Sequence, residues 1–196
     1  MIGRLTGTLV AKQPPWLVLD VGGVGYEVEA PMSTFYKLPA TGEKLTLQTH
    51  LTVREDAHLL FGFATTAEKT LFRELIRVSA IGPKLALAIL SGISVEEFWQ
   101  VVRAGDTVRF SKLPGIGKKT AERLVVEMRD KAGQGAVPGR GTAGQAVAMG
   151  PLQEARSALT ALGYKPTEVD RLTDAVYEDG MRTEQIIQEA LKRAAR

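Results

Sequence analysis

The sequence predicts a multidomain chain, β-structured in its first third and α-helical after it. Short β-rich runs end near residue 63, the apolar periodicity becomes helical from about residue 67, and a glycine-rich stretch interrupts the helices. We therefore predict a five-stranded barrel at 1–63, a helical domain at 64–131, a flexible linker at 132–151 and a three-helix bundle at 152–196.

The first part contains five short runs rich in valine, leucine, threonine and aromatic residues, separated by proline, glycine or charged turns. These runs lie at 5–10, 16–21, 26–29, 44–51 and 58–61, with a short helical connection at 32–38. Five strands of this length fit the OB architecture, although an SH3-like barrel or a small sandwich would fit the same count.

Apolar residues recur at helical spacing through the second part. One stripe comprises Leu71, Phe72, Leu75, Ile76 and Val78, and a second apolar run lies at 85–90. Ser94 followed by Glu97 predicts a capping box that begins the next helix. A last helix is expected at 118–131, so this part is all-α.

The stretch at 132–151 has six glycines and two prolines but no aromatic residue, leucine or isoleucine, so it cannot bury a core. As a glycine-rich coil its ends would lie roughly 25 Å apart. Three short helical patterns follow it, with Pro166 at a predicted helix start and Gly163 and Gly180 at predicted stops. They predict a three-helix bundle.

Composition excludes several classes of site. The 196 residues include no cysteine, so disulfides, thiolate nucleophiles, iron–sulfur clusters and zinc fingers are excluded, and a reducing, cytoplasmic environment is expected. His50 and His58 lack metal-ligand spacing and are predicted as surface or strand residues. The start has no signal-peptide pattern, and no run approaches the ~18 apolar residues of a membrane span. We expect no cofactor.

Basic charge is concentrated in the middle of the chain. The net charge is +3, and residues 64–130 carry 11 Lys and Arg against 8 Asp and Glu. An acidic partner such as nucleic acid would therefore meet this segment, although so small an excess is also found on ordinary solvated surfaces.

The helical middle contains an internal repeat at an offset of 35 residues: Val78, 81–84 and Ala86 recur as Leu113, 116–119 and Ala121. Each copy lies between helical patterns, which is typical of a helix-hairpin-helix. In that motif, a tight glycine turn aims backbone N–H groups and a helix N-terminus at a phosphate oxygen. Glycine keeps the approach open, and neighbouring lysines add attraction without sequence information.

Alone, Gly82 or Gly117 would equally fit an ordinary helix end beside solvated lysines. Two copies in register favour nucleic-acid binding, because paired hairpins can grip both backbones of a duplex across one groove. Ala80 stands where the second copy has Gly115, so phosphate contact is the weaker prediction for the first copy.

Shorter motifs resemble three other kinds of site. The segment 115–120 resembles part of a P-loop, but Lys112 stands where the first glycine is required and no strand precedes it. The segment 23–25 lacks the third glycine of a dinucleotide site. The second hairpin also looks like that of DNA glycosylases, with Lys119 as nucleophile, but the region that should hold the catalytic aspartate is the linker.

Longer motifs are distributed along the chain. They are VREDAH at 53–58, GPKLALAIL at 82–90 and LPGIGKKTAERL at 113–124, joined by MIG at 1–3, GGVGY at 22–26 and ALGY at 161–164. Together they resemble the RuvA family of Holliday junction proteins. The resemblance covers the whole chain. A general helix-hairpin-helix DNA-binding module and a DNA glycosylase or lyase are the alternatives.

The resemblance implies an OB domain, a tandem helix-hairpin-helix domain and a mobile three-helix domain. It further implies a homotetramer that holds a four-way DNA junction open and square-planar, with a face-to-face octamer left open. Such a protein has no catalytic site. It loads the hexameric ATPase RuvB for branch migration in recombination and repair, and the resolvase RuvC acts on the same junction.

Site residues carried over by motif fall into three groups. The phosphate contacts are Gly82, Lys84, Gly115, Gly117, Lys118, Lys119 and Arg123. Glu55 and Asp56 match an acidic pin, although two acids in a turn often reflect turn chemistry alone. The motor-facing apolar residues are Leu159, Leu162, Tyr164 and Leu191. Of these, Leu159 and Leu162 also fit a bundle core, and Tyr164 is the better candidate for exposure.

Overall fold

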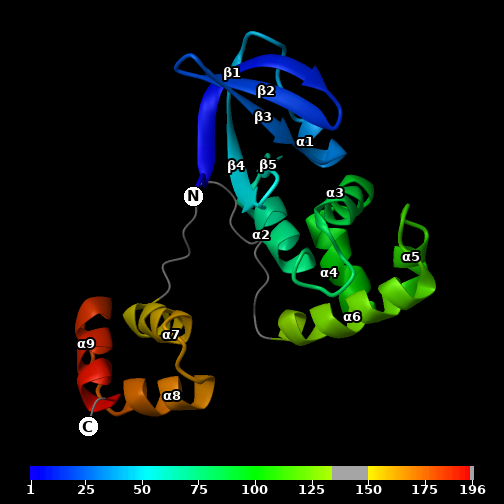
Figure 1. Ribbon diagram of the computed structural model, residues 1–196. Coiled ribbons are helices and arrows are strands. Elements are labelled where there is room, and N and C mark those ends of the chain that lie inside the picture. The colour runs from blue at the N-terminus through cyan, green and yellow to red at the C-terminus, as the bar shows by residue number, and fades with distance from the viewer. Residues whose placement is uncertain (134–149, 195–196) are drawn as a thin grey trace. The chain divides into compact units, whose positions relative to one another are not determined.

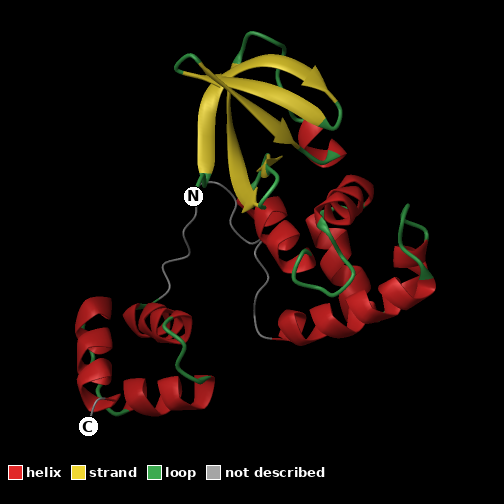
Figure 2. Cartoon of the chain, viewed as in Figure 1, coloured by secondary structure: helices red, strands yellow, loops and turns green. Residues whose placement is uncertain are grey.

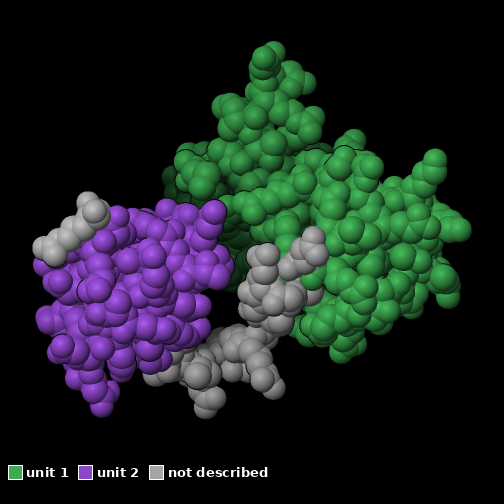
Figure 3. All heavy atoms as spheres, turned by 90° about the horizontal axis from the view of Figure 1, so that it is seen from below, with its two compact units in different colours: residues 1–140 green, residues 141–196 purple. Residues whose placement is uncertain are grey.

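The computed structural model describes residues 1–133 and 150–194. The chain forms two compact units, Met1–Arg140 and Gly141–Arg196, coloured green and purple in Figure 3. The predicted linker lies almost entirely outside the described residues. No single helix among the described residues is long and apolar enough to cross a membrane.

The first unit begins with a closed barrel of five strands in the order β1-β2-β3-β5-β4 (Figure 1). The strands are β1 (Arg4–Gln13), β2 (Trp16–Val21), β3 (Val24–Glu29), β4 (Lys44–Val53) and β5 (His58–Phe63). Of the described strand pairs, only β3 and β5 are parallel. Closure is possible because β1 pairs with both β2 and β4. The predicted five-stranded barrel is confirmed.

Alternating apolar residues of the strands fill the barrel. Fully buried members include Leu9, Leu17, Leu19, Val28 and Leu47. The predicted helical connection is one short helix, α1 (Met32–Phe35), whose Phe35 adds to the same core. Burial alternates along β2, as the period of two predicts, whereas β5 is buried on both faces: Leu60 belongs to the barrel core, and Phe61 and Phe63 belong to the core shared with the helices.

The helices that follow, red in Figure 2, belong to the same unit. They are α2 (Thr66–Leu75), α3 (Pro83–Gly92), α4 (Val95–Ala104), α5 (Thr107–Ser111) and α6 (Lys118–Gly133). One continuous core joins them to the barrel, because Phe61 and Phe63 of β5 pack against Phe72 of α2 at ring distances of 5.0 and 4.9 Å. The short helix α5 was not predicted.

The predicted capping box at Ser94 is only half formed, which corrects the expectation from sequence. The Ser94 hydroxyl accepts a hydrogen bond from the Glu97 N–H, but the Glu97 carboxylate pairs instead with Arg109 of α5. A complete capping box occurs at α2, where Thr65 and Glu68 bond reciprocally. The charge-assisted bond between Glu97 and Arg109 takes the place of the weaker bond from the Ser94 N–H to Glu97. The capping pattern could not predict it, because Arg109 lies outside that pattern.

Hydrogen bonds join the barrel and α1 to the segment that follows β5. Lys69 Nζ donates to the Gly3 carbonyl at 2.8 Å, Met32 N–H donates to Ser91 Oγ at 2.9 Å, and Ala64 N–H donates to Thr34 Oγ1 at 3.0 Å. With the shared core, these bonds fix α3 and its hairpin relative to the barrel.

The second unit consists of α7 (Pro151–Ala161), α8 (Pro166–Asp174) and α9 (Thr183–Ala194). The predicted stop at Gly163 is confirmed, since this residue takes φ of +99° directly after α7. The predicted stop at Gly180 is wrong: α8 already ends at Asp174, and Gly180, with φ of +89°, lies in the turn before α9. Arg156 of α7 reaches Asp170 and Asp174 of α8, and the apolar residues of the three helices form one small core. The predicted three-helix region is confirmed.

Candidate nucleic-acid interface

The two copies of the repeat fold into two turns with the same hydrogen bonds. Ile81 N–H donates to the Val78 carbonyl at 3.0 Å, and Ile116 N–H donates to the Leu113 carbonyl at 3.2 Å. The following helices open alike: Ala86 bonds to Gly82 and Ala121 bonds to Gly117, at 3.0 and 2.9 Å. The sequence repeat is therefore a structural repeat, with one turn leading into α3 and the other into α6.

Ala80 and Gly115 take the same left-handed conformation, with φ of 69° and 82°. An alanine pays a steric cost there that a glycine does not, yet the turn is kept. The substitution at Ala80 thus leaves the backbone of the first hairpin in the geometry of the second.

At Gly82 and Gly117, neither the backbone conformation nor the packing within the described chain excludes a side chain. Gly82 has φ of −86°, which any residue adopts, and Gly117 has no positive φ. A Cβ atom added at either position would meet no described atom within 4 Å. Both residues are exposed. The missing side chains therefore leave room for close approach of a group outside the chain at both helix starts.

The start of α3 offers unpartnered donors at this point. Within the described part of the chain no side chain caps the helix, and Pro83 at its first turn has no N–H, so the amides of Lys84 and Leu85 face outward from the turn. The helix dipole adds positive potential. This arrangement suits a phosphate oxygen.

The two turns lie against each other. A Cβ on Gly115 would come within 3.2 Å of Leu85 Cδ1 in the first turn of α3. Arg123 of α6 donates to Ser79 Oγ of the first hairpin at 3.0 Å. Arg123, predicted as a phosphate contact, therefore also links the hairpins. Ser79 was missed, since no sequence signal pairs residues 44 positions apart.

Lys118, Lys119 and Lys84 are all exposed, and none forms an ion pair with a described residue. Lys84 differs in its surroundings, because its side chain borders a pocket shared with Glu29 of the barrel. The exposure of Lys118 and Lys119 does not suit a lysine nucleophile, which requires a desolvated environment. Helix α5, not a strand, precedes the segment that resembles a P-loop.

Glu55 and Asp56 lie in the turn between β4 and β5, which Arg54 N–H closes by donating to the Ala57 carbonyl at 2.8 Å. Both carboxylates are exposed, and no described residue pairs with them. They therefore project two uncompensated negative charges.

The four apolar candidates of the second unit are not equally placed. Leu159 is fully buried in the small core, so it is not a surface residue, which corrects that part of the prediction. Tyr164 and Leu191 are half-buried against the same core, whereas Leu162 is 63% exposed. Leu162, rather than Tyr164, is the most exposed apolar side chain among them.

The two histidines have different roles. His58 is exposed in β5, as predicted. His50 of β4 packs edge-on against Phe72 of α2 with ring centroids 5.6 Å apart. Burial, and then the charges of Arg73 and Lys69, lower the pKa of His50. No group of three potential metal ligands occurs among the described residues.

The barrel and the two glycine turns, each leading into a helix, together define a protein of the helix-hairpin-helix class. Family models match along the chain: RuvA N terminal domain at 1–62, SAM-like helix-hairpin-helix tandem at 72–130, and RuvA C-terminal domain at 150–195.

Relatives called Holliday junction branch migration complex subunit RuvA match the chain at full length. The one from Thioalkalivibrio sulfidiphilus is 57% identical over 98% of both chains. Those from Nitrosococcus oceani and Pseudomonas fluorescens are 54% and 52% identical over 98% of this chain, covering 99% and 98% of their own lengths. This chain belongs to the RuvA family.

Proposed function

We propose that this chain binds four-way DNA junctions without sequence preference and serves as the junction-binding subunit of a branch migration complex. The observation that carries the proposal is the pair of open glycines, Gly82 and Gly117. Their open Cβ positions lie at the starts of α3 and α6, whose preceding turns touch. Membership in the RuvA family supports the choice of a junction over other nucleic acids.

In this proposal the hairpins hold phosphates and read no bases. Backbone amides at the two helix starts donate to phosphate oxygens, while Lys118, Lys119 and Arg123 supply attraction. Contacts of this kind fix the position of DNA on the protein but are indifferent to sequence, as a protein acting at a moving crossover requires.

Glu55 and Asp56 have the opposite task in the proposal. In a homotetramer, fourfold symmetry would bring eight negative charges around one axis, where four strands exchange. Repulsion there would keep strands apart and would penalise a continuous duplex lying across the same surface. A junction held open and square-planar satisfies both the hairpins and the acidic turns. Assembly into a tetramer or a face-to-face octamer is part of the same proposal.

The chain would supply no catalysis. We assign ATP hydrolysis to the motor RuvB, which would dock on an apolar surface of the second unit formed by Leu162, Tyr164 and Leu191, and strand cleavage to RuvC on the same junction. The setting for this work is the cytoplasm, where chromosomal DNA of a bacterium lies.

A band-shift titration with a four-way junction and a linear duplex of equal strand length tests the proposal. We expect tighter binding to the junction, and native mass measurement of the complex should give four or eight chains per junction. Equal affinity for the two DNAs, with one chain bound, would instead indicate a general helix-hairpin-helix module.

A further inference from the structure

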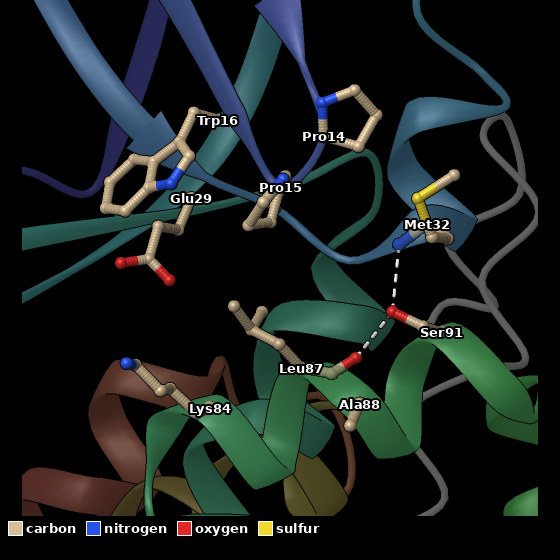
Figure 4. Close-up of a pocket in the computed structure, with 10 residues that line it drawn as sticks. Pro14, Pro15, Trp16, Glu29, Met32, Lys84, Leu87, Ala88 and Ser91 are labelled. Carbon is tan, nitrogen blue, oxygen red and sulfur yellow. Dashed lines mark hydrogen bonds between the residues drawn. The ribbon is translucent and has the colours of Figure 1, made fainter. Parts of the chain in front are cut away.

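A pocket of about 530 Å³ separates the barrel from the first hairpin (Figure 4). The cis Pro14–Pro15 turn and Trp16 line it from the barrel, and Leu87 and Ala88 line it from α3. These walls are apolar. Two charged side chains, Glu29 and Lys84, are the exceptions.

Glu29 is an unusual residue to find in such a place. It ends β3, pairs with Trp16 in the β2–β3 ladder, and is only 7% exposed. Within the described part of the chain no donor forms a hydrogen bond or a close ion pair with its carboxylate. Burial raises the pKa of Glu29, the charge of Lys84 lowers it, and Glu27 raises it further.

Lys84 is the group that faces this carboxylate. Figure 4 shows the Glu29 carboxylate and the Lys84 amine on opposite walls, directed toward each other. Glu29 is the only acid among the described residues that line the pocket, and Lys84 the only base. Opposite charges that face each other across a pocket attract, and the burial of Glu29 reduces the screening of this attraction by water on the barrel side.

We propose that Glu29 is a positioning residue that draws Lys84 toward the barrel and so withholds its charge from DNA at the first hairpin. The inference rests on the proposed DNA-binding function. It makes the hairpins unequal: the first grips phosphate with backbone amides, whereas the second adds the charges of Lys118 and Lys119. Lys84 was carried over by motif as a direct contact, and Glu29 restrains it from that role.

Four proteins test the proposal by junction affinity over a salt series: the intact chain, Glu29→Gln, Lys84→Met, and the double variant. Glu29→Gln should bind the junction about two- to fivefold tighter, because the released Lys84 can then form one exposed ion pair with a DNA phosphate. Its log–log salt slope should steepen by about 0.9 per chain, as neutralisation of one further phosphate requires. In the Lys84→Met background the same change should have no effect.

Glu27→Gln is the matched control. Glu27 lies two residues earlier on the same strand and is exposed, so its replacement removes the same charge nearby without freeing Lys84. An equal gain in junction affinity from Glu27→Gln would overturn the proposal, and so would a gain from Glu29→Gln that persists in the Lys84→Met background. Either result would mean that these acidic residues simply repel DNA. Thermal unfolding of each variant establishes that it is folded.

A second measurement needs no DNA and separates this inference from the proposed function. The motion of the Lys84 side chain, followed by NMR relaxation of its labelled Cε in the free protein, should increase in Glu29→Gln and stay unchanged in Glu27→Gln. Unchanged motion in Glu29→Gln would overturn the inference even if junction binding is confirmed. Failure of all variants to bind junctions would contradict the proposed function alone.

Discussion

Gly82 and Gly117 are the two residues at which the proposed binding turns can be told apart from ordinary helix starts. Gly82 and Gly117 have open space at their Cβ positions, while Gly115 has positive φ and a neighbour at 3.2 Å. Replacing Gly82 and Gly117 by alanine should therefore leave the free energy of unfolding nearly unchanged. The small loss at the cap is offset by the lower entropy of the unfolded chain.

The same double variant should lose junction affinity by about tenfold or more, since a charge-assisted hydrogen bond contributes roughly 1.5–3 kcal/mol. Gly115→Ala is the contrasting variant: it should lose about 1 kcal/mol of stability because alanine is strained at positive φ. Binding isotherms and urea unfolding measure the two effects. Unaltered affinity in Gly82→Ala/Gly117→Ala would mean that nothing approaches these turns.

The lysines of the second hairpin should contribute charge rather than shape. Lys118→Ala/Lys119→Ala should lower affinity equally for all sequences and reduce the log–log salt slope by about 0.9 for each phosphate that is no longer neutralised. Lys165→Ala/Lys192→Ala removes two exposed charges from the second unit and serves as the control. An unchanged salt slope in Lys118→Ala/Lys119→Ala would show that these lysines are solvated surface residues that contact no phosphate.

At this scale the sequence located the two turns, because the offset of 35 makes them a pattern. The assignment of their glycines and lysines to phosphate stays a prediction. Ser79 and Glu29 were missed because Arg123, which bonds to Ser79, and Lys84, which borders the same pocket as Glu29, are distant from them in the chain. Leu159 was misplaced because helical spacing alone does not say which side of a helix is buried.

At the scale of elements, periodicity predicted the five strands and the long helices because each buries one face. Helix α5 was not predicted, because its five residues are too few to show a helical period. The cap of α4 was half right: Ser94 bonds as predicted, but the Glu97 carboxylate is engaged by Arg109. Local patterns therefore failed where a side chain had a better partner in space.

The packing of His50 of β4 against Phe72 of α2 should make the free energy of unfolding sensitive to acid. The fold lowers the pKa of His50 below its ordinary 6.5, because burial and the charges of Arg73 and Lys69 disfavour the imidazolium. The stability that the neutral ring contributes is therefore full above pH 6.5. It is lost as the pH falls through the lowered pKa, because the unfolded chain takes up the proton first.

Urea unfolding followed by tryptophan fluorescence measures this effect, since both tryptophans, Trp16 and Trp99, lie in the first unit. Between about pH 7.5 and 5.5, which brackets the ordinary histidine pKa, the intact chain should lose more stability than His50→Gln. His58→Gln, at an exposed site of β5, should behave like the intact chain. Identical pH profiles for the intact chain and His50→Gln would show that the packing of His50 against Phe72 does not respond to this proton.

For the whole molecule, DNA binding and motor coupling should be separable. The hairpins and the acidic turn belong to the first unit, and the apolar surface around Leu162 belongs to the second. A chain ending near residue 144 should therefore bind junctions as the intact chain does, yet fail to stimulate the ATPase and branch migration of RuvB. Leu162→Asp in the intact chain should reproduce the second defect. Abolished junction binding on truncation would contradict the separation.

We predict that the acidic turn, Glu55 and Asp56, gives the molecule a preference for branched DNA. A carboxylate about 6 Å from a phosphate is repelled by roughly 0.7 kcal/mol in water, and several acting together favour strands that separate. Neutralising Glu55 and Asp56 to glutamine and asparagine should strengthen binding to duplex more than binding to junction. The matched control is Glu178→Gln/Asp179→Asn, an exposed acidic pair in the second unit.

Selection of branched DNA by the acidic turn is tested most directly by the ratio of junction affinity to duplex affinity, measured at one salt concentration for the intact chain and Glu55→Gln/Asp56→Asn. We predict a ratio well above one for the intact chain and a smaller ratio for the variant, with the fold and the number of chains per complex unchanged. A ratio near one for the intact chain, or one that stays the same or rises in the variant, would contradict this role.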